Sequence, residues 1–255
     1  MRIVDRMLEL LDLLSDKDEG YMITEISEML DIPISSIHRM LSSLKKHGYI
    51  IQDQQTRKYR MGLKVLRLAV NMLNHMDVRV VARRHMEDLS KKYGEIVFLT
   101  ILDVDTKSAI CIDTVTPFSG YSFYVKVGSE MPMNAAVSAQ VILAYMDEDT
   151  IDTVIGAREH KPFTPNSLLD SELIKEKLYV IRKKGYGICD EELEMGVRAI
   201  AAPVMNLHGQ VTASITMVGI KLGEYIEEKK IQDIQETAVN ISQALGFQRK
   251  KQISV

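Results

Sequence analysis

The stretch from residue 24 to residue 62 reads TEISEMLDIPISSIHRMLSSLKKHGYIIQDQQTRKYRMG. Its pattern predicts a helix, a tight turn, a second helix that begins near Pro33, and a short β-ribbon. Proline suits the first turn of a helix, where a missing N–H costs little, and Gly48 stands where a glycine commonly ends one. Residues 49–51 can then pair with residues 58–61 across a polar turn. This order of elements is typical of a winged helix-turn-helix, whose second helix enters the major groove of DNA.

The second predicted helix has two distinct faces. Ile37, Leu41 and Leu44 recur at helical spacing, so they are expected to pack against the preceding helix. The opposite face carries small hydroxyls, which allow a close approach to DNA, and basic residues that reach phosphates or guanine edges. The residues expected to contact DNA are Ser35, Ser36, His38, Arg39, Ser42, Lys45 and Lys46 in the helix, with Arg57 and Lys58 in the ribbon.

Charge is distributed unevenly along the chain. The whole sequence has a net charge of −3, which by itself does not indicate nucleic-acid binding. Residues 35–70 hold eight basic residues and one acidic residue, whereas residues 1–34 hold three basic and nine acidic residues. A basic recognition segment on an otherwise acidic molecule is typical of a DNA-binding surface. The alternative is that these basic residues only keep the surface of a helix and a hairpin in contact with water. The predicted helix, the glycine after it, the hairpin and the charge together favour double-stranded operator DNA as a partner.

Length and composition narrow the class of protein. The chain has 255 residues, enough for two domains. It contains no stretch of about eighteen apolar residues, so no membrane partner is expected. The pattern of residues 2–15 predicts an amphipathic helix with acidic residues on its polar face. A signal peptide would instead have an uninterrupted apolar centre, so this segment is not expected to be one. The two cysteines, Cys111 and Cys189, are too few for a disulfide framework and indicate a cytoplasmic location.

The pattern along the chain predicts an α+β fold. An apolar-rich helix over residues 63–76 is expected to connect two modules and to contact a second subunit. We therefore predict a winged helix-turn-helix domain over residues 1–62, a linker helix over residues 63–78 and a larger domain over residues 79–255. Further helices are expected at about residues 80–93, 135–146, 171–184 and 227–245. Hairpin-spaced strands of a largely antiparallel sheet are expected at residues 96–102, 108–114, 121–127, 199–205 and 210–220.

Short motifs recur in a specific order along nearly the whole chain. The N-terminal part contains Ile32-Pro33, Ile37-His38-Arg39-Met40-Leu41, Gly48-Tyr49 and Tyr59-Arg60-Met61-Gly62. The C-terminal part contains Val127-Gly128, Pro132-Met133-Asn134-Ala135, Gly185-Tyr186-Gly187, Glu191-Glu192, Gly196-Val197 and Ala201-Ala202-Pro203-Val204. In this order and spacing they resemble the IclR family of bacterial transcriptional regulators. The resemblance implies an N-terminal winged helix, a GAF-like effector-binding domain with an antiparallel sheet flanked by helices, and assembly as a homodimer or homotetramer.

The sequence departs from the family pattern at two places. Ile34 stands where the family often has a basic or polar residue, and it cannot contact phosphate by charge. Residues 134–140 read NAAVSAQ, where the family usually has His-Ala-Thr-Ala-x-Gly-Lys. The second departure does not threaten the fold, but it leaves the effector unidentified.

The start of the helix expected near residue 135 is a candidate ligand site. Asn134 is expected to cap this helix. Ala135 and Ala136 then leave the first N–H groups open to an anion, which predicts a carboxylate as the small-molecule effector. The alternative is that Asn134 is only a cap.

The resemblance places the effector between this helix start and neighbouring strands. The loop Gly187–Glu191 is expected to close over it. The further residues that this implies are Cys189 and Asp190 in the loop, and Ala199, Ser214 and Thr216 in the strands. The alternative is that Ser214 and Thr216 merely fill a strand face.

No arrangement typical of an enzyme is evident. Cys189 with a distant histidine is the one nucleophile arrangement to consider, and the histidines show no ligand or triad spacing. Residues 191–194 are acidic, which is more typical of the first turn of a helix. We therefore expect no catalysis, cofactor or metal. The alternative function is a GAF-like sensor or enzyme whose N-terminal module mediates protein contacts, and a gel shift with DNA from the protein's own upstream region separates the two.

Overall fold

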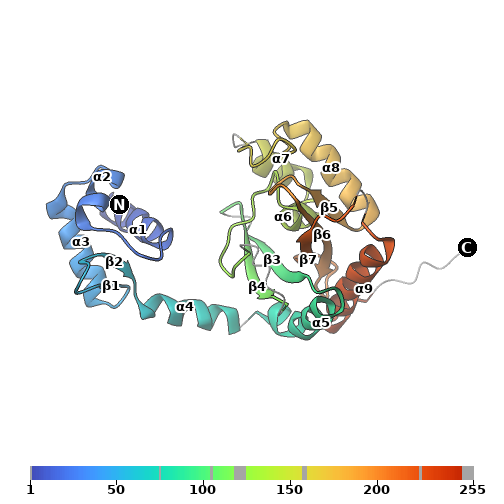
Figure 1. Ribbon diagram of the computed structural model, residues 1–255, viewed down its shortest axis with the longest axis horizontal. Coiled ribbons are helices and arrows are strands. Elements are labelled where there is room, and N and C mark those ends of the chain that lie inside the picture. Colours follow the sequence, from blue (N-terminus) through green and yellow to red (C-terminus); the bar gives the residue numbers. More distant parts are fainter. Residues whose placement is uncertain are drawn as a thin grey trace, which may run out of the picture. The chain divides into compact units, whose positions relative to one another are not determined.

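The chain folds into two compact units. The computed structural model describes residues 2–74, 76–103, 106–117, 125–156, 160–223 and 226–248. The units divide between residues 75 and 76, and each has its own hydrophobic core (Figure 1). The first unit is helical with a two-stranded ribbon, and the second has an antiparallel sheet covered by helices. The predicted α+β fold is therefore confirmed.

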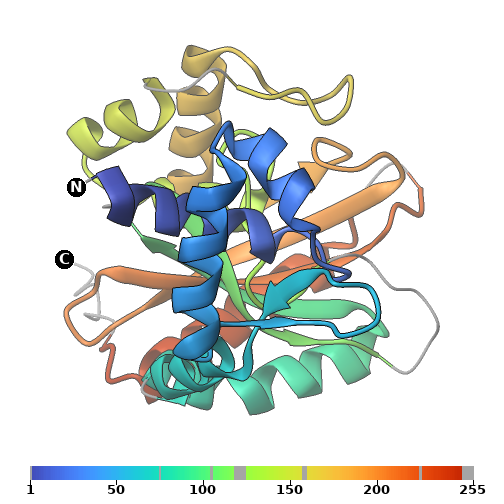
Figure 2. The same ribbon diagram turned by 90° about the vertical axis from the view of Figure 1, so that its left-hand side faces the viewer.

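The first unit contains the predicted winged helix-turn-helix. Its elements are α1 (Arg2–Ser15), α2 (Ile23–Leu30), α3 (Ile34–Lys46), β1 (Ile50–Gln52), β2 (Tyr59–Met61) and α4 (Leu63–Asn74). The strands β1 and β2 pair antiparallel, with Ile50 opposite Met61. A further antiparallel bridge joins Tyr21 to Tyr59. Figure 2 shows this hairpin (cyan) with α3 (blue).

The ends of α3 follow from the residues beside it. Pro33 is the residue before the helix rather than part of its first turn, and its carbonyl accepts the N–H groups of Ser36 and Ile37 at 2.9 and 3.1 Å. At the other end Gly48 has a φ of 78°, which glycine adopts at little cost. The buried face of α3 consists of Ile37, Met40, Leu41 and Leu44, as the spacing predicts.

The second unit is built on a five-stranded sheet in the order β4-β3-β7-β6-β5, in which every neighbouring pair is antiparallel. The strands are β3 (Ile96–Asp103), β4 (Ser108–Val115), β5 (Gly187–Asp190), β6 (Val197–Met205) and β7 (Val211–Ile220). The helices are α5 (Asp77–Tyr93), α6 (Val137–Leu143), α7 (Glu148–Gly156), α8 (Ser171–Lys184) and α9 (Glu228–Ala244).

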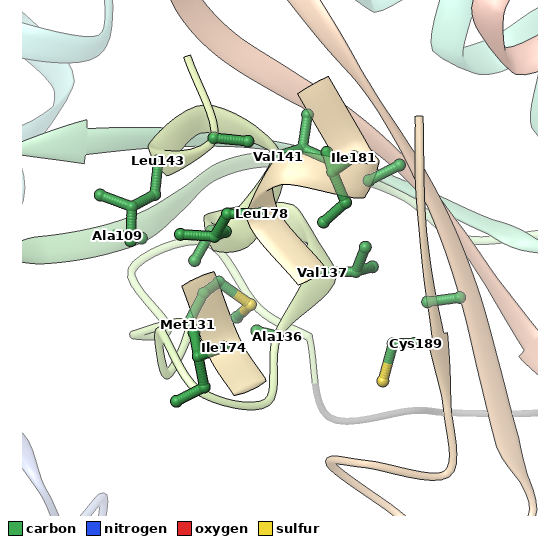
Figure 3. Close-up of a cluster of buried hydrophobic side chains, with 14 of the residues drawn as sticks. Ala109, Met131, Ala136, Val137, Val141, Leu143, Ile174, Leu178, Ile181 and Cys189 are labelled. Carbon is green, nitrogen blue, oxygen red and sulfur yellow. The ribbon is translucent and has the colours of Figure 1, made fainter. Parts of the chain in front are cut away.

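Helices cover both faces of this sheet. The helices α5 and α9 pack against one face, and α6, with α8 beyond it, packs on the other (Figure 1). Side chains alternate between the faces along a strand, so Phe98 of β3 joins the cluster with α6 while Leu99 points to the opposite side. Figure 3 shows Ile174, Leu178 and Ile181 of α8 lying beside α6.

The helix expected at residues 135–146 is shorter than predicted. The N–H groups of Ala135 and Ala136 both donate to the Pro132 carbonyl, at 3.2 and 2.8 Å, so these two residues belong to a turn. The helix α6 therefore starts at Val137, and Ala136 precedes it without a side-chain cap. The prediction that Asn134 caps this helix is wrong, because the turn at Pro132 separates it from the helix start.

Two other expectations concern strands. Of the strand expected at residues 121–127, residues 121–124 lie outside the described part of the chain, and residues 125–127 form no strand. The expected loop Gly187–Glu191 is instead mainly the edge strand β5, paired with β6. Gly187 suits this place because a Cβ there would lie 2.6 Å from Val137.

The helix α7 was not predicted, although its sequence contains a start signal. The Asp147 carboxylate accepts the Thr150 N–H at 2.8 Å and the Thr150 hydroxyl at 3.0 Å. Glu148 and Asp149 follow in the first turn, where acidic residues favour the helix dipole. These hydrogen bonds keep the Asp147 carboxylate ionised, because they lower its pKa.

Candidate DNA-binding surface and ligand cavity

The polar face of α3 is fully available to solvent in the first unit. All of the residues predicted there are exposed, namely Ser35, Ser36, His38, Arg39, Ser42, Lys45 and Lys46. The Lys45 ammonium lies 3.4 Å from the Gln52 side chain in β1, which links the end of the helix to the hairpin. The arrangement gives one continuous face of hydroxyls and positive charge beside the ribbon.

The hairpin tip is held in shape by Asp53. Its carboxylate accepts the Thr56 N–H at 2.8 Å and the Gln55 N–H at 3.0 Å. The bond from Thr56 holds the pKa of Asp53 below its usual range, so the turn persists when the pH falls moderately. Arg57 follows with a φ of 62° and an exposed side chain. Lys58 is half-buried, and its ammonium lies 3.7 Å from the Glu19 carboxylate, so Arg57 is the more accessible of the two predicted bases.

The second unit contains a cavity of about 300 Å³ between the start of α6 and the sheet. Of the residues predicted for an effector site, four line it: Ala136, Cys189, Ala199 and Thr216. The remaining lining is Phe98, Val125, Ser129, Glu130, Met131, Pro132, Val137, Ser138, Phe163, Leu193, Glu194, Val197 and Val218. Figure 3 shows Val137 and Cys189 on facing elements of this region. The walls are mainly apolar, with Phe98 and Phe163 as the aromatic rings.

Two hydroxyl groups in the cavity lining have no partner. The side chains of Ser138 and Thr216 are 1% and 0% exposed. Their oxygens are shielded from solvent and form no hydrogen bond within the described residues. A buried hydroxyl without a partner is costly, so each oxygen would gain a hydrogen bond from a ligand atom that reached it. The prediction missed Ser138, although it stands one turn after Asn134 in the same motif.

Four of the predicted effector residues lie elsewhere. Ala135 is fully buried outside the cavity lining. The Asn134 amide donates to the carbonyls of Lys161 and Leu168, at 3.0 and 3.1 Å. Asn134 therefore holds a neighbouring loop, and it lines an adjoining hollow rather than the cavity itself.

Ser214 and Asp190 also have structural partners. The Ser214 hydroxyl donates to the Ser138 carbonyl at 2.7 Å, which ties β7 to α6. The Asp190 carboxylate pairs with the Arg198 guanidinium at 2.8 and 3.0 Å, and this pairing lowers its pKa. Alternation along β5 places Asp190 on the face away from Cys189. Neither Ser214 nor Asp190 lines the cavity, so their contact with a ligand stays a prediction that this geometry does not support.

The contrast between Thr216 and Ser214 gives a testable result for stability. Thr216→Val removes an unpartnered hydroxyl at nearly constant volume, so the unliganded protein should become more stable by about 1 kcal/mol. Ser214→Ala removes a hydroxyl that makes a hydrogen bond, so it should lose about the same amount. Thermal unfolding of the two variants measures both changes. A loss of stability in Thr216→Val would show that its hydroxyl has a partner.

The segment 191–196 passes over the cavity between β5 and β6, and ion pairs fix it. The Lys177 ammonium of α8 lies 2.5 and 2.6 Å from the two carboxylate oxygens of Glu192. The Lys221 ammonium lies 2.5 Å from the Glu191 carboxylate. Burial raises the pKa of Glu192, and the charge of Lys177 opposes that effect. The acidic residues belong to this bent segment, so the expectation of a helical turn there is wrong.

The sequence offers Cys189 as the one candidate nucleophile, and the structure buries it. Burial raises the pKa of the Cys189 thiol, so the thiol is protonated and unreactive at neutral pH. Among the described residues, no group of three His, Cys, Asp or Glu side chains could hold a metal ion. In the same part of the chain, no helix has the length and apolar character needed to cross a membrane.

Known proteins resemble this chain over nearly its full length. The regulator XynR of Escherichia coli K12 is 28% identical over 248 residues, which are 96% of this chain and 97% of that protein. The regulator KdgR of the same organism is 29% identical over 227 residues, covering 88% of this chain and 86% of that protein. Both are described as HTH-type transcriptional regulators.

Solved structures show the same fold. An IclR-type regulator from Alicyclobacillus acidocaldarius superposes with a TM-score of 0.81 at 26% identity, covering 96% of this chain and 99% of that one. An IclR homologue from Microbacterium hydrocarbonoxydans, solved with 4-hydroxybenzoate, superposes with a TM-score of 0.82 at 21% identity, covering 95% and 98%. The second likeness concerns the fold alone.

Family models match both units. The model for the IclR helix-turn-helix domain matches residues 3–54. The model for the C-terminal domain of the bacterial transcriptional regulator IclR matches residues 70–244, more than half of the chain. Together with the exposed face of α3 and the fold of the second unit, these matches confirm the resemblance seen in the sequence. The chain belongs to the IclR family of bacterial transcriptional regulators.

Proposed function

We propose that this regulator binds operator DNA in the cytoplasm as a dimer or dimer of dimers and responds to a small molecule in the cavity of its second unit. The observation that carries the proposal is the exposed basic face of α3 beside a hairpin that carries Arg57, Lys58 and Arg60. Double-stranded DNA is the partner that this charge and shape fit best. Within this face we assign base contacts to Arg39 and phosphate contacts to Lys46 and Arg57, because all three side chains are exposed.

The helix α4 supports assembly from more than one copy. Its side chains Leu63, Leu66, Leu68 and Met72 are 51–78% exposed in the single chain. Exposed apolar residues on more than one side of a helix favour contact with another surface. We therefore propose that α4 is the linker and part of a subunit contact, consistent with two recognition helices reading two half-sites.

The chemical class of the ligand is less simple than the sequence suggests. The expectation of a carboxylate depended on Asn134 as a cap and on open N–H groups at Ala135 and Ala136. Asn134 does not line the cavity, and both N–H groups donate to the Pro132 carbonyl. The start of a helix attracts an anion by about 0.3–1 kcal/mol. Burying a carboxylate without a cation costs several kcal/mol. The carboxylate stays a prediction, but the geometry supports a ligand that meets Ser138 and Thr216.

Two alternatives receive less support. A GAF-like sensor whose first unit contacts only proteins has no need for a basic face on α3. An enzyme needs an activated nucleophile or acid–base pair, and burial keeps the Cys189 thiol protonated. The matched relatives named above are also described as transcriptional regulators. We therefore propose that the chain performs no catalysis.

The experiment that tests this function fills the cavity. Ala199 is 8% exposed and lines it, so Ala199→Leu should reduce the response of operator binding to a metabolite at least tenfold. Operator affinity without ligand should stay within about twofold, because the first unit has its own core. The matched control is Ala244→Leu, at an exposed position at the end of α9. An unchanged response in Ala199→Leu, with the fold intact by thermal unfolding, would place the ligand elsewhere.

A larger side chain at Ala135 would not test the cavity. That residue is fully buried outside the cavity lining, so Ala135→Leu should disturb packing of the second unit rather than block ligand selectively. Overpacking of this kind typically costs about 1–3 kcal/mol. Ala199→Leu is therefore the appropriate variant, because the added atoms enter open space.

A further inference from the structure

We infer that the ligand of the second unit is uncharged at neutral pH: an apolar, ring-sized body that carries one hydroxyl or carbonyl group facing Ser138 and Thr216. This inference rests on the proposed function for the place of binding, and it adds the chemical class. It differs from the carboxylate that the sequence alone predicts.

The size and walls of the cavity suit a compact apolar body. An apolar cavity of about 150 Å³ can hold benzene, and this one measures about 300 Å³. It therefore has room for a ring with a short substituent. Apolar contact comes from both sides, with Phe98, Val218 and Ala199 from the sheet. Met131, Val137 and Phe163 complete the wall opposite.

The two polar groups in the lining that lack a hydrogen-bond partner among the described residues are neutral hydroxyls. Ser138 and Thr216 come from α6 and β7, and both hydroxyl oxygens lack a partner within the described residues. A hydroxyl can donate or accept a hydrogen bond, so the pair matches an uncharged oxygen that does the same. The neighbouring Ser214 hydroxyl is already bonded to the Ser138 carbonyl. The two orphan groups are therefore the ones left for a ligand.

The charges around the cavity oppose an anion. Its described lining contains no Lys, Arg or His, and its charged members are Glu130 and Glu194. The ammonium of Lys177, on the neighbouring helix, is already paired with Glu192. A carboxylate in this cavity would be buried without a counter-ion, which is strongly unfavourable.

An adjoining hollow offers the one competing arrangement within the described residues. It shares Glu130, Pro132 and Phe163 with the cavity, and it is also lined by His160 and Lys161. The Lys161 ammonium lies 5.7 Å from the centre of the Phe163 ring. An acid long enough to span both spaces could place its charge near Lys161. Such an acid is a direct competitor of the inference, so the probes must include acids.

The test uses matched pairs of probes on the full chain. The pairs are benzyl alcohol with benzoate, 4-hydroxybenzyl alcohol with 4-hydroxybenzoate, and cyclohexylmethanol with cyclohexanecarboxylate, each titrated at pH 7 by calorimetry and checked by thermal shift. We expect the alcohol to bind at least about tenfold more tightly than its acid in each pair that binds. Tighter binding of the acids, or no binding by any alcohol, would overturn the inference.

Variants identify the polar contact. Thr216→Val and Ser138→Ala should each weaken binding of 4-hydroxybenzyl alcohol by about five- to tenfold, and they should leave binding of toluene within about twofold. Lys161→Ala should change neither the affinity for 4-hydroxybenzyl alcohol nor the affinity for toluene. Equal loss for the alcohol and toluene would contradict a hydrogen bond from these hydroxyls.

The inference and the proposed function can fail separately. One outcome is that an alcohol binds the wild type, that Ala199→Leu removes this binding, and that the alcohol does not change operator affinity. This outcome would uphold the ligand class and reject regulation through the cavity. A response of operator affinity to an acid but to no alcohol would uphold regulation and reject the ligand class. Calorimetry without DNA therefore tests the ligand class, and anisotropy with DNA tests regulation through the cavity.

Discussion

Arg39→Ala should weaken binding to the operator by about 10- to 100-fold, which corresponds to about 1–3 kcal/mol. Arg39 is exposed on the polar face of α3, and Ser35, Ser36 and Ser42 on the same face allow the helix to approach DNA closely. A guanidinium can bind a guanine edge with two hydrogen bonds, so its loss should also relax sequence preference. Fluorescence anisotropy with a labelled operator measures both effects.

The matched control for this variant is Arg84→Ala. Arg84 is an exposed arginine in α5 of the second unit, so its removal changes net charge by the same amount. Its operator affinity should stay within about twofold of the wild type at one salt concentration. If Arg39→Ala bound the operator as tightly as Arg84→Ala, α3 would not be the recognition helix.

Gly20→Val should destabilise the first unit by about 2–5 kcal/mol. Gly20 has a φ of 71°, and a Cβ there would lie 2.2 Å from the carbonyl oxygen of Tyr59. The left-handed backbone costs about 1–2 kcal/mol for a residue with a side chain, and the clash with fixed backbone adds a cost of about 1–3 kcal/mol. The bridge between Tyr21 and Tyr59 must therefore break, and operator binding should be lost with it.

The matched control is Gly94→Ala. Gly94 has a similar φ of 66°, but nothing lies within 4 Å of a Cβ built there. This variant should lose only about 1 kcal/mol, and that loss should fall in the second unit. Thermal unfolding followed by hydrogen exchange separates the two units. Equal stability of Gly20→Val and Gly94→Ala would contradict the close contact at Tyr59.

Local sequence signals predicted the elements whose ends are decided locally. The helix α8 occupies the predicted residues, Ser171–Lys184. The Asp170 carboxylate accepts the N–H groups of Glu172 and Leu173, and Gly185 ends the helix with a φ of 75°. The helix α1 also matches its prediction, and α3 buries the predicted apolar face. Capping residues and apolar spacing lie close together in sequence, so they can be read without a structure.

The candidate ligand site was only partly predictable because distant contacts determine it. Asn134 resembles a helix cap in sequence, but its amide binds the carbonyls of Lys161 and Leu168, about thirty residues away. Ser214 resembles a ligand donor, but its hydroxyl binds a carbonyl 76 residues earlier. Side chains alternate between the two faces of the sheet along β5, so Cys189 lines the cavity and the neighbouring Asp190 points to the opposite face. Such partners become evident only when strands and helices are placed in space.

The surface of α3 was easier to predict than the cavity for a physical reason. A DNA-binding face belongs to one amphipathic helix, so helical spacing alone separates Arg39 from Ile37. A ligand cavity collects residues from several elements, and small differences in register change its lining. Ser138 is an example. Its place beside the cavity depends on the position of β7, whose Ser214 hydroxyl binds the Ser138 carbonyl, as much as on α6.

Two copies of this chain should read DNA through paired recognition helices. Selection of binding sites from a random pool of duplex DNA, followed by footprinting of the selected sequence, tests this expectation most directly. We expect an inverted repeat whose half-sites are separated by about 34–36 Å or a multiple of that distance, and Arg39→Ala should reduce the enrichment and relax its sequence preference. A pool that shows no enriched sequence, or a single asymmetric half-site bound by one chain, would contradict the account.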